Sequence, residues 1–260
     1  MNGLGRQLVR YVTSRAGEQL AYNYTPGRSP TVVFLSGYAS DMTGSKALYL
    51  EAVVTALGFG FLRLDYSGHG VSDGDFVQGC IGRWAEDAMT VIREATEGPL
   101  LLVGSSMGGW IMLIIARQLA GRVSGLVGIA AAPDFTEDLM WRSLDADQRD
   151  ELVSKGELYL DSDYVDDPYP VTIKLIEDGR QQLQLQAPIP IACPVRLIHG
   201  LQDSEVPWAT SITLAERLES SDVQVTLVKR GGHRLSEAEQ LTQIAQTIEQ
   251  LLELVAKPSP

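Results

Sequence analysis

The sequence predicts an α/β domain with a mostly parallel central sheet, flanked by helices and interrupted by one insertion after the sixth strand. Apolar strand-like runs alternate with helical stretches along most of the chain, which is typical of βαβ units. The alternation stops over residues 134–187, which are acidic and irregular, and resumes at Cys193-Pro194. A chain of 260 residues suits one domain with a full core. We therefore expect a single domain, 1–260, that carries a lid at about 134–187.

Each element is assigned from local composition and periodicity. The expected strands are residues 7–13, 19–24, 31–35, 59–65, 100–103, 123–130, 195–199 and 223–228. The expected helices are residues 45–57, 81–96, 110–120, 208–218 and 235–255, with shorter helical pieces at 145–155 and 169–178 inside the insertion. The helix at 110–120 is apolar almost all round, so we expect it to be buried on most sides.

Composition excludes several classes of function. A net charge of -12 argues against nucleic acids and anionic membranes as partners, because both would repel the chain. Two cysteines and three histidines lack CxxC or HExxH spacing, and the acidic run at 161–167 lacks the spacing of an EF-hand, so we expect no bound metal. The chain shows no signal-peptide pattern and no apolar run long enough to span a bilayer. These features favour a cytoplasmic protein, and they leave its oligomeric state open.

The segment Gly104-Ser105-Ser106-Met107-Gly108 matches the G-x-S-x-G pattern of a nucleophile elbow. An apolar strand enters it and an apolar helix leaves it, as such an elbow requires. The sharp turn brings strand and helix close together, so the positions around the serine must lack bulky side chains. The turn also places the Ser106 hydroxyl at a helix N-terminus, where the positive end of the helix dipole stabilises negative charge. The alternative is an ordinary Gly-Ser turn.

A serine nucleophile needs a neighbouring base, and histidine suits this role because it exchanges a proton near neutral pH. His233 follows the last expected strand and precedes the last helix, at the same edge of the sheet as Ser106. His69 lies in a glycine-rich loop that it more simply shapes, and His199 ends a strand and is expected to pack beneath the site. We therefore assign His233 as the general base, with a helix-entry or surface histidine as the alternative.

The base needs a carboxylate that fixes its tautomer, and Asp203 follows the strand that ends at His199. The order of nucleophile, acid and base along the chain is then the order typical of α/β hydrolases. Asp203 as a turn or helix-cap residue is the structural alternative. Asp134 and Glu205 are the rival acids.

Acyl transfer builds negative charge on the former carbonyl oxygen, and backbone N–H groups aimed at that oxygen stabilise it. One donor should be Met107, directly after the nucleophile. The second should come from the loop after the strand at 31–35, where Gly37 permits unusual backbone angles. We assign this role to the N–H of Tyr38, with a neighbouring residue as the alternative.

Four motifs occur in the order found in one known subfamily. They are Phe34-Leu35-Ser36-Gly37-Tyr38, Asp65-Tyr66-Ser67-Gly68 through Ser72-Asp73-Gly74, Val103-Gly104-Ser105-Ser106-Met107-Gly108-Gly109-Trp110, and His199-Gly200 through Asp203 with Val206-Pro207-Trp208. Together with Pro188-Ile189-Pro190-Ile191-Ala192-Cys193-Pro194, they resemble the α/β-hydrolase subfamily of mitochondrial palmitoyl-protein thioesterases and acyl-glucuronide esterases. The resemblance covers nearly the whole chain. The lid matches less clearly, and the absence of a transit peptide indicates a bacterial-type relative.

The resemblance implies a Ser-Asp-His esterase or thioesterase that needs no cofactor, and it selects Ser106, Asp203, His233, Tyr38 and Met107. The substrate is then a small-molecule or acyl-protein ester or thioester. The same residues would also serve a peptidase, a lipase or a carbon–carbon hydrolase, and a non-catalytic ligand-binding protein is the alternative from another class.

Apolar side chains in the insertion have two open interpretations. They line an acyl-chain pocket, or they only pack the lid onto the sheet. The side chains are Met140, Trp141, Leu144, Leu152, Leu158, Tyr159 and Leu160.

Overall fold

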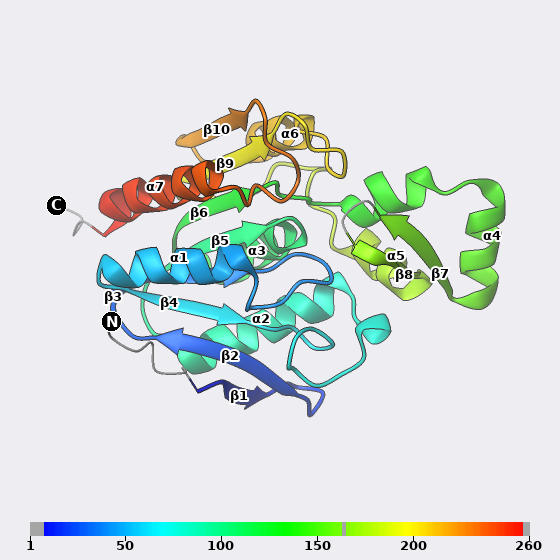
Figure 1. Ribbon diagram of the computed structural model, residues 1–260, viewed down its shortest axis with the longest axis horizontal. Helices are drawn as coiled ribbons and strands as arrows, with labels where there is room; N and C mark the ends of the chain where they lie inside the picture. Colours follow the sequence, from blue (N-terminus) through cyan, green and yellow to red (C-terminus); the bar gives the residue numbers. More distant parts are fainter. Residues whose placement is uncertain (1–7, 163–164, 257–260) are drawn as a thin grey trace.

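The computed structural model describes residues 8–162 and 165–256. Eight strands within these residues form a mostly parallel sheet in the order β1-β2-β4-β3-β5-β6-β9-β10 (Figure 1). The β1–β2 and β2–β4 pairs are antiparallel and the other pairs are parallel. The strands are β1 (Arg10–Thr13), β2 (Gln19–Thr25), β3 (Arg28–Leu35), β4 (Phe59–Leu64), β5 (Leu100–Ser105), β6 (Val123–Ile129), β9 (Val195–Gly200) and β10 (Val223–Val228). All eight expected strands are therefore confirmed, although the expected start of the first, residue 7, lies outside the described residues.

Helices cover both faces of this sheet. Helices α1 and α7 pack on one face, and α2, α3 and α6 pack on the other (Figure 1). Their bounds are α1 (Ser45–Ala56), α2 (Ile81–Ala95), α3 (Met107–Gln118), α6 (Ala209–Arg217) and α7 (Ala238–Val255), with a short turn of helix η1 at Phe76–Gln78. The predicted fold class is confirmed.

Alternation along the central strands explains the two-sided core. In β3, Val32 and Phe34 belong to the apolar cluster beneath α1 and α7, whereas Val33 and Leu35 belong to the cluster beneath α2 and α3. Successive strand residues point to opposite faces, so a strand covered on both sides must be apolar at nearly every position. The continuous run at 31–35 has this composition.

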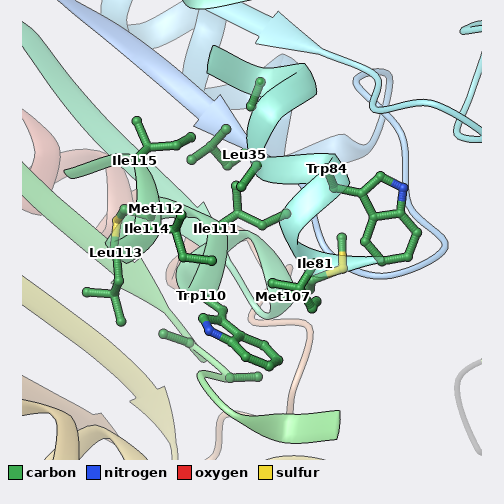
Figure 2. Packing of buried hydrophobic residues seen from close by; sticks show 14 of the residues in the cluster. Leu35, Ile81, Trp84, Met107, Trp110, Ile111, Met112, Leu113, Ile114 and Ile115 are labelled. Atoms are coloured by element: carbon green, nitrogen blue, oxygen red, sulfur yellow. The ribbon is translucent and has the colours of Figure 1, made fainter. Parts of the chain in front are cut away.

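Helix α3 lies at the centre of the larger cluster, as its sequence predicts. Every residue from Met107 to Ala116 is buried, and Trp110, Ile111 and Met112 belong to one cluster with Leu35, Ile81 and Trp84 (Figure 2). Burial of this many large apolar side chains contributes about 2 kcal/mol each before the entropy of ordering them is subtracted. Helix α3 is therefore a rigid support for the residue that precedes it.

Two helix starts differ from the sequence prediction. Helix α3 begins at Met107, three residues before the predicted start, because tertiary packing outweighs the poor helix propensity of Gly108 and Gly109. Helix α7 begins at Ala238, three residues after the predicted start, because Leu235 has a φ of 44° that a right-handed helix does not accept. Both differences fall beside residues of the predicted site.

The insertion after β6 forms a small layer of its own. It comprises η2 (Thr136–Trp141), α4 (Ala146–Lys155), β7 (Glu157–Ser162), β8 (Val165–Thr172) and α5 (Ile173–Gln181). The two helical pieces are confirmed near their predicted positions. The sequence missed the β7–β8 hairpin, which replaces the start of the helix expected at 169–178. In Figure 1 this layer lies beyond the end of the sheet toward which the parallel strands point.

Hydrogen bonds fasten this layer to the body of the domain. The Tyr38 hydroxyl donates to the Pro170 carbonyl at 2.6 Å, and the Trp110 indole donates to the Gln182 carbonyl at 3.0 Å. The Gly82 amide donates to Asp178 at 2.8 Å. The insertion is thus held against the loop after β3 and against α2 and α3. Asp163, part of the acidic run, lies outside the described residues.

None of the helices formed by residues 8–162 and 165–256 has the length and apolar character that a membrane span requires.

Candidate active site

Ser106 occupies a strained turn between β5 and α3. Its φ of 54° lies in the left-handed region, which a residue with a side chain adopts only when the surrounding structure enforces it. Here the Ser106 amide donates to the Ile129 carbonyl at 2.9 Å, and the Ser106 carbonyl accepts from Gly109 at 2.8 Å and Ala132 at 3.1 Å. These bonds to the ends of β6 and α3 hold the turn open toward the insertion.

The glycines around Ser106 are required by close contacts, as predicted. A Cβ at position 108 would overlap the Leu35 carbonyl, and one at position 104 would overlap the carbonyl of residue 108. A Cβ at position 109 would lie 2.5 Å from the Cβ of Ala131. Real side chains do not approach this closely, so the elbow forms only with glycine at these positions.

His233 reaches Ser106 from the loop that follows β10. Its Nε2 lies 2.9 Å from the Ser106 Oγ, and its Nδ1 lies 2.8 Å from Oδ2 of Asp203. Both contacts are hydrogen-bond distances. The structure therefore joins the three side chains that the sequence had placed at the ends of separate strands.

The Asp203 carboxylate is fully buried, yet surrounded by donors. Its Oδ1 accepts from the amides of Glu205 at 3.0 Å and Val206 at 2.8 Å, and its Oδ2 accepts from His233. Burial raises the pKa of Asp203, but hydrogen bonds from His199 and His233 and from the Val206 amide outweigh burial and hold it well below its ordinary value. Asp203 is therefore anionic at neutral pH, as the partner of a catalytic histidine must be.

A close approach of two loops brings the acid and the base together. Strands β9 and β10 are paired in parallel, so their carboxyl ends lie side by side. A Cβ at Gly200 would overlap the Gly231 carbonyl, and the Gln202 amide donates to that carbonyl at 2.9 Å. Glycine at position 200 thus allows the loop of Asp203 to pack directly on the loop of His233.

The structure also places the rival residues. Asp134 accepts hydrogen bonds from the Gln184 amide at 2.7 Å and the Leu185 amide at 2.9 Å, so its carboxylate anchors the end of the insertion. The backbone amide of Glu205 donates a hydrogen bond to the Asp203 carboxylate. Both rivals support the loops around the site, whereas the carboxylate bonded to His233 is that of Asp203.

His69 is buried among the rings of Tyr66, Phe76 and Trp84, at centroid distances of 5.0 to 5.4 Å. Burial lowers its pKa to about 4, against smaller opposing effects of the Ser67 carbonyl and Asp41. A neutral histidine in such a cluster shapes its loop, as predicted.

The loop after β3 lies directly against the nucleophile. A Cβ at position 37 would be 3.3 Å from the Cβ of Ser106, and Ala39 has a φ of 52°. Met107 is the first residue of α3, and amides in the first turn of a helix have no acceptor within the helix. The loop that carries Tyr38 and the first amide of α3 therefore both lie next to Ser106.

Two pockets open beside Ser106 and His233. One, of about 500 Å³, lies under the insertion and is mainly apolar. The other, of about 350 Å³, has more polar and charged side chains in its lining, and we call it the polar pocket. The apolar pocket is lined by Tyr38, Ala39, Ser106, Ala132, Phe135, Leu139, Met140, Ser143, Leu160, Tyr169, Ser204, Glu205, Val206, Pro207 and His233. The polar pocket includes Ser36, Ser40, Asp41, Ser45, Lys46, Arg234 and Ser236.

The apolar side chains of the insertion divide between a pocket lining and the core. Met140 and Leu160 line the apolar pocket. Leu144, Leu152 and Leu158 are buried in the core cluster, so they pack the insertion. Tyr159 is 57% exposed, and Trp141 packs at the margin of the core.

Sequence reasoning missed several residues of the apolar pocket. These are Ala132, Phe135, Leu139, Tyr169, Val206 and Pro207. Phe135, Leu139 and Met140 have helical spacing just after β6, which would have been a usable signal. Tyr169 gave no such signal, because it belongs to the hairpin that the sequence did not predict.

The comparisons agree with this geometry. The profile of the alpha/beta hydrolase family matches residues 32–247. The chain belongs to the alpha/beta hydrolase family. It is 38% identical to "palmitoyl-protein thioesterase ABHD10, mitochondrial" of Mus musculus, over 93% of this chain and 81% of that protein. The human protein of the same name is also 38% identical, over 90% of this chain and 76% of that protein.

Solved structures give the same result. The alpha/beta hydrolase domain-containing protein 10 from mouse superposes with a TM-score of 0.88 and 36% identity, covering 95% of this chain and 98% of that one. The crystal structure of a hydrolase from Agrobacterium vitis S4 superposes with a TM-score of 0.90 and 38% identity, covering 94% of this chain and 98% of that one. The chain is a serine hydrolase of the esterase and thioesterase class.

Proposed function

We propose that Ser106, His233 and Asp203 form the catalytic triad of a long-chain acyl thioesterase or esterase. One observation carries this proposal: the hydrogen-bonded chain from Asp203 through His233 to the Ser106 Oγ opens into an apolar pocket. The strained elbow, the buried anionic acid and the glycine-dependent loop contacts all support this geometry. The acyl enzyme forms on the serine, and no cofactor takes part.

The proposed reaction proceeds in two steps. His233 Nε2 accepts the hydroxyl proton as Ser106 Oγ attacks the carbonyl carbon, and it then donates that proton to the leaving oxygen or sulfur. In the second step His233 removes a proton from water, which attacks the acyl enzyme and releases the acid. Asp203 holds the Nδ1–H tautomer and stabilises the imidazolium throughout.

The amides of Tyr38 and Met107 are the proposed oxyanion donors. Each such donor contributes about 3 to 4 kcal/mol to the transition state when it is aimed at the oxyanion. The Tyr38 hydroxyl bond to Pro170 fixes this loop from the side of the insertion. We therefore propose that residues 134–187 act as a lid on a single domain, and that the lid also holds the oxyanion loop in place.

The pockets divide the substrate into two parts. The pocket of about 500 Å³ lies within the range of small-molecule sites and suits a fatty acyl chain. The polar pocket on the other side of Ser106 then receives the leaving group, either a small alcohol or thiol or a cysteine of an acylated protein. The relatives are named palmitoyl-protein thioesterases, which supports the acyl half of this assignment.

The compartment is also part of the proposal. Cys80 and Cys193 are both free thiols, which suits the reducing cytoplasm. The relatives are named as mitochondrial, so fractionation of the native host tests this point.

The test of the triad is labelling with a fluorophosphonate, which reacts only with an activated serine. Wild type should be labelled stoichiometrically, and Ser106→Ala should not be labelled. Ser105→Ala is the matched control, since it changes the adjacent serine of the same turn. Equal labelling of wild type and Ser106→Ala would refute the assignment of the nucleophile.

The test of the substrate is a series of butanoyl, octanoyl and palmitoyl thioesters of one thiol. We expect kcat/KM to rise with chain length, because each added methylene buried in the apolar pocket contributes about 0.8 kcal/mol. A profile that favours the butanoyl thioester would refute the long-chain assignment and leave the triad intact.

A further inference from the structure

A second histidine, which the proposed mechanism does not use, lies in contact with Asp203. The Nε2 of His199 lies 3.1 Å from Asp203 Oδ2, the same oxygen that bonds His233. The His199 ring also lies 2.7 Å from Ser211 Oγ through Nδ1 and 3.0 Å from the Val206 carbonyl through Nε2. Two imidazoles therefore share one carboxylate oxygen.

The partners of His199 define its tautomer. The Val206 carbonyl and the anionic Asp203 are acceptors only, so the proton must be on Nε2. The Ser211 hydroxyl can donate, so it satisfies Nδ1 as an acceptor. Both nitrogens of His199 are then paired, and the single Nε2–H lies between the Val206 carbonyl and Asp203 Oδ2.

His199 acts only through Asp203. The His199 side chain is fully buried and Ser211 is 1% exposed, and the two pockets beside Ser106 are lined by neither residue. No substrate group reaches this pair, so Ser211 is not a second nucleophile. The pair nevertheless touches the acid of the triad directly.

We propose that His199 is a positioning residue for the hydrolytic reaction, fixed by Ser211 so that its Nε2–H locks the Asp203 carboxylate in the orientation that His233 requires. This inference rests on the proposed triad. A carboxylate can rotate about its terminal torsion, which is broad. The amides of Glu205 and Val206 fix Oδ1, and His199 lies beside Oδ2 together with His233.

The Nε2–H of His199 also confines the proton to the active site. Because Nε2 already carries a hydrogen, His199 cannot accept a proton from Asp203. Its bond withdraws some negative charge from Oδ2, which lowers the affinity of the coupled Asp203–His233 pair for a proton.

Other titratable groups surround this network and must be considered in any pH profile. Glu205 and Tyr169 line the apolar pocket beside His233. Asp41, Lys46 and Arg234 line the polar pocket on the other side. All of these groups remain in the variants below, so a difference between the variants isolates the contribution of His199.

The experiment compares His199→Leu with His199→Gln, with kcat and KM measured on one aryl ester across pH. The Leu variant has no donor, and we expect kcat to fall about 10- to 100-fold while KM changes less than about 3-fold. The acidic limb of its kcat/KM profile should move up by about 0.5 to 1 pH unit, because the Asp203–His233 pair then holds a proton more tightly.

The Gln variant tests rescue. Its amide offers two N–H groups for the two acceptors, Asp203 and the Val206 carbonyl, so kcat should recover to within about 5-fold of wild type. A purely structural His199 would give a lower Tm in the Leu variant with unchanged kcat and pH profile below that Tm. That outcome would overturn the proposal, as would a Gln variant no better than Leu.

Two further variants keep the test decisive if His199→Leu does not fold. Ser211→Ala removes one oxygen and should lower kcat about 3- to 10-fold with the same direction of pH shift; an unchanged profile would overturn the proposal. In an Asp203→Ala background, adding His199→Gln or Ser211→Ala should change kcat less than about 2-fold, because the path runs through Asp203. If Asp203→Ala itself has no effect, the triad is wrong; if only the His199 and Ser211 variants have none, the positioning role alone fails.

Discussion

Replacing Asp203 with asparagine should be far more damaging than its small change in shape suggests. The side chain is fully buried, three hydrogen-bond donors point at its two oxygens, and His199 Nε2 lies 3.1 Å from Oδ2. An amide has one oxygen, which satisfies the most donors when it faces the two backbone amides at Oδ1. Its NH₂ group then faces His233 and His199, where the carboxylate had accepted.

This orientation imposes the wrong tautomer on the base. An NH₂ group that donates to His233 Nδ1 leaves the proton on Nε2, and Nε2–H cannot accept the proton of Ser106. The imidazolium also loses its negative partner. We expect a fall in kcat of about 10,000-fold, or ~5 kcal/mol of transition-state stabilisation, with KM nearly unchanged.

Asp134→Asn is the matched control, because Asp134 is equally buried and also accepts two backbone amides. It should lower kcat less than about 5-fold, although it can lower Tm. Steady-state hydrolysis of one aryl ester, with circular dichroism to confirm folding, measures both variants. A larger loss in Asp134→Asn than in Asp203→Asn would move the catalytic acid to the end of β6 and refute the reasoning.

Three further outcomes follow from the described contacts. Gly108→Ala presses its Cβ onto the Leu35 carbonyl of β3, so it should lower the free energy of unfolding by about 1 to 3 kcal/mol and abolish most of the activity. Gly121→Ala is the control, because open space surrounds that position, and it should leave Tm and activity close to wild type. His69 has a folded pKa of about 4 against 6.5 when unfolded, so between these values the unfolded state binds more protons and stability falls as pH falls. His69→Phe should remove this loss, so its free energy of unfolding relative to wild type should be more favourable at about pH 5.5 than at neutral pH, by roughly 1 kcal/mol. Thermal unfolding of both proteins at the two pH values measures this, and an equal difference in Tm at both would contradict the prediction. Met140→Trp should fill the apolar pocket and lower kcat/KM for a palmitoyl thioester about 10-fold while sparing the butanoyl thioester, and Val153→Trp, on an exposed part of the insertion, should leave the chain-length profile unchanged.

The sheet and the three proposed catalytic side chains were predictable because both depend on strand ends. A parallel sheet brings the residues after its carboxyl ends to one edge, so Ser106, Asp203 and His233 could be placed together from chain order alone. The glycines beside Ser106 carried further information, since they are required by backbone contacts that every elbow of this shape makes.

The insertion was less predictable because its sequence signals conflict. Leu158 and Leu160 alternate with polar residues as a half-buried strand does, but Pro168 and Pro170 in the partner strand argue against sheet structure. A two-stranded sheet tolerates these prolines, since its edges need no further partner. Tertiary contacts, such as the bond from the Tyr38 hydroxyl to Pro170, then decide the outcome, and they are invisible in local periodicity.

The contact between His199 and Asp203 shows the same limit at the active site itself. The sequence placed His199 beneath the site as a packing residue, and burial confirms that position. Its chemistry depends on partners from the acid loop and from α6, which meet this β9 residue only in the folded chain. A buried histidine in contact with Asp203, Val206 and Ser211 is costly to assemble for packing alone, because an apolar side chain would fill the space without needing three partners. That cost is explained if the orientation of Asp203 determines how well His233 accepts the proton of Ser106.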